Sequence, residues 1–86
     1  MEVVCLGATP THHIVHKDGS EADIYIPTTQ QQQLESIYSQ SIRGARASIC
    51  LHFHDACVAK YGEEWPKTHP RIEWEEITVK PIDTTS

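Results

Sequence analysis

The sequence predicts an α+β fold, in which a small, mainly antiparallel sheet of about four to five strands packs against one main helix, with a short second helix. The dipeptide Asp18-Gly19 lies between two runs that carry apolar residues, which is a strong signal for a hairpin. Residues 29–43 carry apolar side chains at helical spacing. Residues 46–54 alternate between apolar and polar side chains, as a half-buried strand does.

The chain has 86 residues, of which 38% are hydrophobic and 22% are charged, an ordinary globular composition. This length is enough for one hydrophobic core, so we expect a single compact domain over 1–86 with a frayed tail at 81–86. Residues 2–6 are mostly apolar and are followed by Gly7 and Pro10, so they predict the first strand.

The N-terminal hairpin is expected to join residues 11–17 to residues 20–26 through a two-residue type I′ turn at Asp18-Gly19. Such a turn pairs His16 with Glu21 and assigns alternate residues to opposite faces of the sheet. The face expected to be buried carries His13, Val15, Ala22, Ile24 and Ile26, and the face expected to be solvated carries His12, Ile14, His16, Glu21, Asp23 and Tyr25.

The main helix is expected over 29–43. Thr28 or Thr29 is a suitable N-cap, because a glutamine follows three residues later in either case. Gly44 is the expected C-terminal cap, and the cation Arg43 in the last turn suits the helix dipole. The apolar face of this helix consists of Leu34, Ile37, Tyr38 and Ile42.

The second half of the chain is expected to hold two strands and the short helix. In the last strand the parity of the apolar residues changes at Glu75-Glu76, which suggests a β-bulge there. The expected elements are a strand at 46–54, a helix at 56–61 between Asp55 and Gly62, a loop at 63–70 and a strand at 71–80.

Charge and cysteine content narrow the class of protein. The 12 acidic and 7 basic residues give a net charge of −5, which argues against a protein that binds nucleic acid through phosphate contacts. The sequence has no apolar run of the length of a membrane span, and its first residues do not resemble a signal peptide. The odd number of cysteines, 3, is a poor basis for a disulfide framework, so we expect reduced thiols in a cytoplasmic protein.

The leading functional hypothesis is a non-enzymatic binding or inhibitor protein without cofactor or catalytic residues. Its acidic residues concentrate late in the chain, beside two tryptophans, and such a surface suits a protein or ribonucleoprotein partner with a basic surface. Small acidic domains of this kind are common among phage and mobile-element inhibitors of host defence, and a homodimer through an edge strand is a further expectation. The expected binding surface consists of Glu63, Glu64, Trp65, Glu73, Trp74, Glu75 and Glu76.

An alternative is a zinc-type metal site, which would make the chain a metal-binding protein or a metal-dependent enzyme. On a strand, His52 and His54 point to the same side, and Cys57 follows near the expected start of a helix. His16 is the candidate fourth ligand, with His12 and His69 as further candidates.

A third alternative is a homodimer that sequesters a small ligand. Arg46 and His52 share one face of the expected strand at 46–54, and Arg43 precedes it. These three side chains would bind an anionic ligand in a pocket formed across the dimer.

Overall fold

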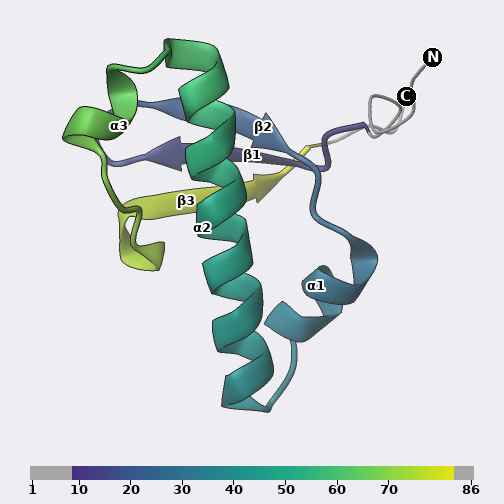
Figure 1. Ribbon diagram of the computed structural model, residues 1–86. Coiled ribbons are helices and arrows are strands. Elements are labelled where there is room, and N and C mark those ends of the chain that lie inside the picture. Colours follow the sequence, from purple (N-terminus) through teal and green to yellow (C-terminus); the bar gives the residue numbers. More distant parts are fainter. Residues whose placement is uncertain (1–8, 83–86) are drawn as a thin grey trace.

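The computed structural model describes residues 9–82 (Figure 1). In this part of the chain the α+β class is confirmed, but the antiparallel sheet has three strands, in the order β2-β1-β3, and not the four to five expected. The expected strand at 2–6 lies outside the described residues. The elements are β1 (His12–His16), β2 (Glu21–Ile24), α1 (Thr28–Leu34), α2 (Ser39–Tyr61), α3 (Trp65–Thr68), the 3-10 helix η2 (Trp74–Glu76) and β3 (Ile77–Pro81).

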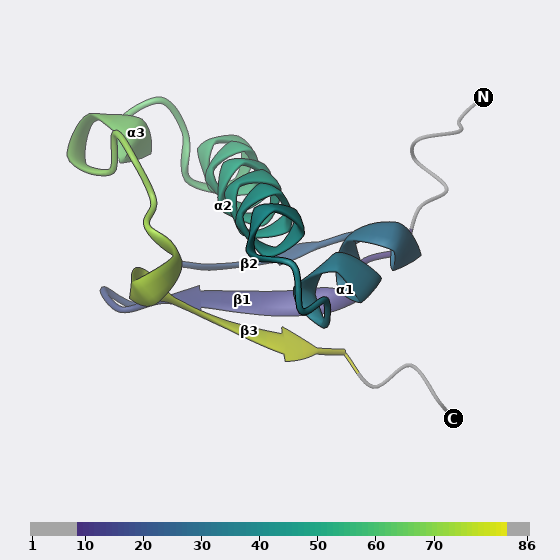
Figure 2. The same cartoon turned by 90° about the horizontal axis from the view of Figure 1, so that it is seen from below.

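The described chain forms two layers, with the helices on one face of the sheet (Figure 2). The long helix α2 crosses that face, and its buried side chains pack on those of the two hairpin strands. Ile14, Ile49 and Phe53 are completely buried in this core. Burying a side chain of this size stabilises a fold by about 1.5–3 kcal/mol. The described helices include none that is both long and apolar enough to cross a lipid bilayer.

The predicted hairpin is present, but its register differs by one residue. His16 donates its N–H to the carbonyl of Ser20 (2.7 Å) and accepts a hydrogen bond from the N–H of Gly19 (2.9 Å). The loop therefore contains three residues, 17–19, and Gly19 adopts the positive φ (+100°) that such a loop requires of its last residue. As a result Val15 pairs with Glu21, and the expected pair of His16 with Glu21 does not form.

The shift reverses the faces of β1, because alternate residues of a strand point to opposite sides. Ile14 is fully buried and His16 is 6% exposed, whereas the side chain of His13 is 35% exposed. The prediction for β2 is confirmed, since Ala22 and Ile24 are buried.

The single helix expected over 29–43 is wrong. The helical structure is interrupted between the end of α1 at Leu34 and the start of α2 at Ser39. The hydroxyl of Ser36 accepts the N–H of Tyr38 (3.0 Å), which offers the backbone an alternative to the helical hydrogen bond. Ile37 and Tyr38, expected on the apolar face, are 89% and 71% exposed. Gly44 lies inside α2 and does not cap a helix.

The strand expected at 46–54 is also wrong, because these residues form the middle of the 23-residue helix α2. Ala45, Ile49, Phe53 and Cys57 are all buried, and they recur every fourth residue. Leu51, which a strand would place on the same face as Ile49 and Phe53, is 60% exposed. The buried residues therefore follow the spacing of a helix, and the alternation of apolar and polar side chains over 46–54 does not indicate a strand. The expected helix at 56–61 is the last part of α2, so Asp55 is not its cap.

The end of α2 and the segment after it are predicted in part. Gly62 ends α2 with φ +95°, as expected for a glycine in this position. The expected loop at 63–70 contains the single turn α3. The expected strand at 71–80 is confined to β3, and η2 replaces the expected bulge at Glu75-Glu76. Of the tail expected at 81–86, Pro81 belongs to β3 and Ile82 donates its N–H to the carbonyl oxygen of Thr11 (2.9 Å), and the remaining residues lie outside the described part of the chain.

Candidate functional sites

The structure does not bring together the metal ligands expected from the sequence. His52, His54 and Cys57 lie on α2, where residues two apart do not share a face, so the geometry expected of a strand is lost. His52 is exposed, and His54 donates its Nε2–H to the carbonyl oxygen of His69 (2.9 Å). Among the described residues, no three of the expected set His52, His54, Cys57 and His16 converge as metal ligands.

Cys57 is also unsuited to the chemistry expected of it. It lies in the last turns of α2 and not near a helix start, and it is completely buried. Burial raises the pKa of its thiol to about 11, which disfavours the thiolate that binds metal or acts as a nucleophile. Burial, together with the negative charge of Glu73, raises the pKa of Cys50 in the same way.

The expected acidic surface divides into two parts, and one of its tryptophans is in the core. Trp65 is 7% exposed, and its indole N–H donates to the hydroxyl of Ser20 (3.0 Å). Glu63 and Glu64 are exposed beside it in the turn after α2, and Glu64 forms an ion pair with Lys67 (3.2 Å).

The second part of the expected surface is η2 and the residue before it. Trp74 is half-buried, and the guanidinium carbon of Arg46 lies 5.2 Å from the centre of its ring. Glu73 and Glu75 are exposed, and Glu73 forms an ion pair with Arg71 (2.7 Å). Glu76 is instead bound to Lys17 (3.1 Å) near β1. The N–H group of Glu73 and the ammonium of Lys17 lower the pKa of the Glu76 carboxyl.

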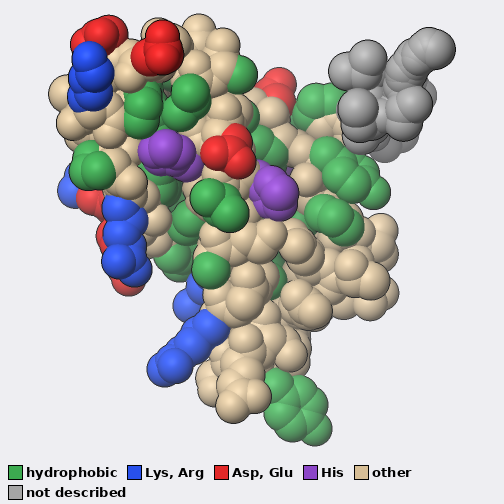
Figure 3. Space-filling view, in the orientation of Figure 1, with side chains coloured by type: hydrophobic (Ala, Val, Ile, Leu, Met, Phe, Trp, Pro, Cys, Tyr) green, Lys and Arg blue, Asp and Glu red, His purple; other side chains and the backbone are tan. Residues whose placement is uncertain are grey.

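A groove of about 700 Å³ runs between α2 and the segment that leads into η2. Two of the three residues expected to bind an anion, Arg43 and Arg46, line it, whereas His52 does not. Figure 3 shows hydrophobic and charged side chains interspersed on the face of the molecule that carries α2. The lining of the groove includes Arg43, Arg46, Leu51, Arg71, Glu73, Trp74 and Glu75.

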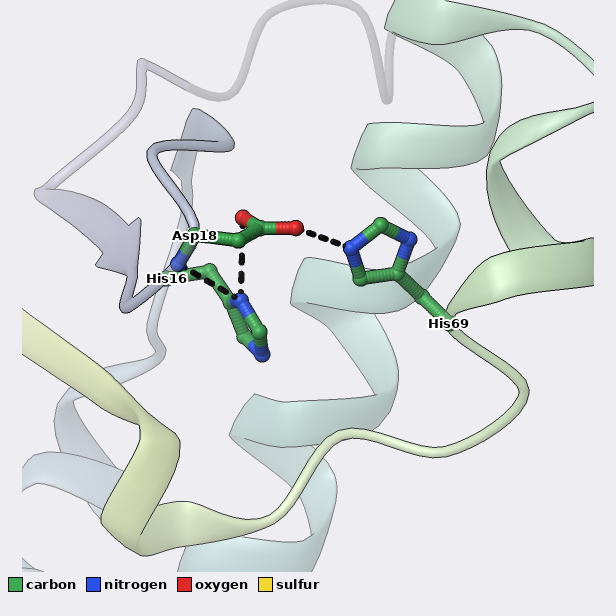
Figure 4. Close-up of side chains that lie close together, drawn as sticks. All are labelled: His16, Asp18 and His69. Atoms are coloured by element: carbon green, nitrogen blue, oxygen red, sulfur yellow. Dashed lines mark hydrogen bonds and ion pairs between the residues drawn. The ribbon is translucent and has the colours of Figure 1, made fainter.

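A second cluster consists of His16, Asp18 and His69, which come from the end of β1, the hairpin loop and the segment after α3 (Figure 4). One ligand atom from each residue lies within 4.8 Å of the other two. Nδ1 of His16 lies 3.0 Å from one carboxylate oxygen of Asp18, and Nε2 of His69 is bonded to the other oxygen.

Local hydrogen bonds position the carboxylate of Asp18. It accepts the N–H of Ser20 (2.9 Å), an Asx turn that belongs to the three-residue hairpin loop. The backbone N–H of Asp18 donates a hydrogen bond to Nδ1 of His16 (3.2 Å). The Ser20 N–H and the His69 side chain hold the pKa of Asp18 well below its usual range, and Asp18 in turn raises the pKa of His69.

Sequence reasoning missed this cluster as a unit, although it named His16 and His69 as candidate ligands. Asp18 was assigned only to the turn, and it is separated from His69 by 51 positions. The available signal was the hairpin register, because a three-residue loop places His16 on the core side beside Asp18. Comparison of this chain with protein family models, curated proteins and solved structures gives no match.

Proposed function

We propose that this protein is a non-enzymatic binding protein that attaches to a protein or ribonucleoprotein partner with a basic surface, through the groove between α2 and η2. The observation that supports it is the combination of exposed Leu51, half-buried Trp74 and the carboxylates of Glu73 and Glu75 in one groove of about 700 Å³. An inhibitor of host defence machinery would be one protein of this kind.

The apolar part of the groove provides the contact area. Leu51 is 60% exposed, although Ile49 and Phe53 near it in α2 are completely buried, and it lines the groove together with Trp74. A tryptophan held in place by its neighbours is a frequent anchor in protein interfaces. We therefore expect an apolar side chain of the partner to insert beside Leu51.

The charges favour a basic side chain next to that contact. Arg71 is paired with Glu73 and Arg46 lies over Trp74, so Glu75 is the lining carboxylate without a cationic partner among the described residues. The net charge of −5 would speed the encounter with a basic surface. Four residues of the surface expected from the sequence do not line the groove, namely Glu63, Glu64, Trp65 and Glu76. Trp65 is in the core, and Glu76 is bound to Lys17.

A randomised peptide library displayed on phage tests this proposal. Selection on the immobilised protein should enrich peptides that combine an apolar residue with lysine or arginine. Their affinity should fall about tenfold or more in Leu51→Ser and in Glu75→Lys. Ile37→Ser and Glu63→Lys are matched controls, because both residues are exposed and lie outside the groove lining. Failure to enrich peptides, or equal losses in the controls, would contradict the proposal.

A second candidate function is the binding of an anionic ligand, and the presence of Arg43, Arg46 and Arg71 in the same groove favours it. Arg43 has no carboxylate partner among the described residues. The same selection distinguishes the two candidates. Enrichment of acidic peptides whose binding is lost in Arg43→Glu and kept in Glu75→Lys would support the anionic ligand.

A further inference from the structure

We infer that His16, Asp18 and His69 form a binding site for a divalent transition-metal ion of the zinc type. The contacts with Asp18 point to Nδ1 of His16, a carboxylate oxygen of Asp18 and Nε2 of His69 as the ligand atoms. To bind the ion, Nδ1 of His16 would give up its hydrogen bond from the N–H of Asp18 (3.2 Å). This site is separate from the groove, and of the expected set His52, His54, Cys57 and His16 it contains His16 alone.

The donor atoms suit zinc. Two imidazole nitrogens and one carboxylate oxygen are ligands that zinc prefers, with bonds of about 2.0–2.2 Å. Mg²⁺ and Ca²⁺ prefer oxygen ligands alone, so the two imidazoles disfavour them. Because the three donor atoms already lie within 4.8 Å of one another, small side-chain movements bring them to bonding distance. Three protein ligands leave a fourth position for water.

The surroundings of His69 direct its Nε2 into the cluster. Its Nδ1 lies 3.0 Å from the carbonyl oxygen of Trp65, which only accepts hydrogen bonds, so Nδ1 carries a proton. Its ring stacks on the indole of Trp65 with 4.2 Å between ring centres and 5° between ring planes. A backbone carbonyl on the outer nitrogen is the usual partner of a metal-bound histidine, because it fixes the tautomer and the ring orientation.

His16 has a looser arrangement on the other side, where a carboxylate lies near its outer nitrogen but beyond hydrogen-bond distance. Its Nδ1 faces Asp18, and its Nε2 lies 3.6 Å from a carboxylate oxygen of Glu76. Glu76 is itself held by Lys17 (3.1 Å) and by the N–H of Glu73 (3.0 Å). A carboxylate behind the outer nitrogen orients a ligating histidine and makes it a better donor. Only 6% of His16 is exposed, so the ring is also fixed by packing.

The cluster is accessible to an ion from solution. The side chains of Asp18 and His69 are 38% and 15% exposed, while His16 forms the buried floor. In the structure, Asp18 and His69 share a hydrogen bond through Nε2. A metal ion would take the position of the proton in that bond and would be bound by both side chains.

The test uses the untagged full chain after treatment with a chelating resin. Calorimetric titration with ZnCl₂ should show one ion per chain, and Co²⁺ should give the visible spectrum of a nitrogen- and oxygen-ligated site. Asp18→Asn and His69→Ala should each weaken Zn²⁺ binding by about 100-fold or more, and Glu76→Gln by about tenfold. His52→Ala is the matched control, since His52 is exposed on α2 outside the cluster, and its affinity should be unchanged.

The ligand variants must be folded for this comparison, which far-UV circular dichroism without metal would establish. Asp18 is 38% exposed, so Asp18→Asn removes the least packing, whereas His69→Ala also removes the ring that stacks on Trp65. Absence of stoichiometric Zn²⁺ binding to the wild-type chain would overturn the inference. An equal loss of Zn²⁺ affinity in His52→Ala would overturn it as well. So would an unchanged Zn²⁺ affinity in both Asp18→Asn and His69→Ala.

Discussion

At the scale of single residues, the hairpin register determines which side chains of β1 support the core. Ile14 is fully buried, and its Cα partner in β2 is the buried Ala22. We predict that Ile14→Ala lowers the free energy of unfolding by about 2–4 kcal/mol, because it leaves a cavity in a packed interior. Urea denaturation is the measurement.

His13→Ala is the control for this prediction. The side chain of His13 is 35% exposed and contacts the exposed carboxylates of Glu21 (3.0 Å) and Asp23 (2.6 Å), so we expect a loss below about 1 kcal/mol. The two-residue turn expected from the sequence would place His13 in the core and Ile14 in solvent. A larger loss in His13→Ala than in Ile14→Ala would therefore show that the register of the structure is wrong.

The buried thiol of Cys57 leads to a prediction about how the free energy of unfolding depends on pH. Burial raises the pKa of its thiol from 9.0 to about 11, so the unfolded chain releases this proton at a lower pH than the folded chain does. The folded state is then favoured below pH 9, and that contribution is lost as the pH rises from about 9 to 11. The loss is at most about 2–3 kcal/mol.

The measurement for Cys57 compares urea unfolding of the wild type and Cys57→Ala at pH 8 and pH 10. The variant should be less stable at pH 8, because a buried sulfur is removed, and the difference should narrow at pH 10. A difference that is constant with pH would contradict the raised pKa. All other side chains are the same in the two proteins, so their contribution cancels in the comparison.

At the scale of elements, the two glycines at positions 44 and 62 have opposite roles. Gly44 is in the interior of α2, and a Cβ there would meet nothing within 4 Å. Gly44→Ala should therefore raise the free energy of unfolding by about 0.5–1 kcal/mol through higher helix propensity. Thermal unfolding followed by circular dichroism measures the effect.

Gly62→Ala is the matched control, because it is the same change at the end of the same helix. Gly62 has φ +95°, a conformation that a residue with a Cβ rarely adopts, so this variant should be destabilised by about 1 kcal/mol. A destabilised Gly44→Ala would favour the helix end expected at Gly44 over the continuous α2 of the structure. A stabilised Gly62→Ala would contradict the helix end at Gly62, which the sequence and the structure share.

Local signals in the sequence predict some elements correctly and others not. The hairpin and the end of α2 at Gly62 depend on glycines in special conformations, and such residues are visible in a sequence. Helix α2 was divided into a helix, a strand and a second helix, because Gly44 resembles a cap and residues 46–54 alternate. The contacts of Ile49 and Phe53 with the sheet decide in favour of one helix, and these contacts are long-range.

At the scale of the whole molecule, the fold class follows from the mixture of patterns, but the candidate sites do not. The groove lies between the middle of α2 and residues 70–75. The proposed metal site combines residues from the end of β1, the hairpin loop and the segment after α3. Each depends on how the helices lie on the sheet. The sequence identified Arg43, Arg46, Glu73, Trp74 and Glu75 as candidates, but it had no means of placing them in one groove.

The metal site leads to a prediction about global stability, because it would connect segments that are far apart in sequence. Asp18 and His69 are separated by 51 positions, and a shared ion tied to both would have to be released before the chain unfolds. An ion that binds the folded chain alone stabilises it by about 2.7 kcal/mol when its free concentration is 100 times the dissociation constant. For a domain of 86 residues this corresponds to an increase in Tm of roughly 10 °C or more.

Differential scanning calorimetry with and without Zn²⁺ measures this increase, and addition of EDTA should reverse it. His69→Ala should unfold at the same temperature with and without Zn²⁺, whereas His52→Ala should keep the full increase. An increase of equal size in His69→Ala would mean that Zn²⁺ stabilises the protein from another place. A decrease in the wild type would mean that Zn²⁺ binds the unfolded chain more tightly, since its 6 histidines are then all available.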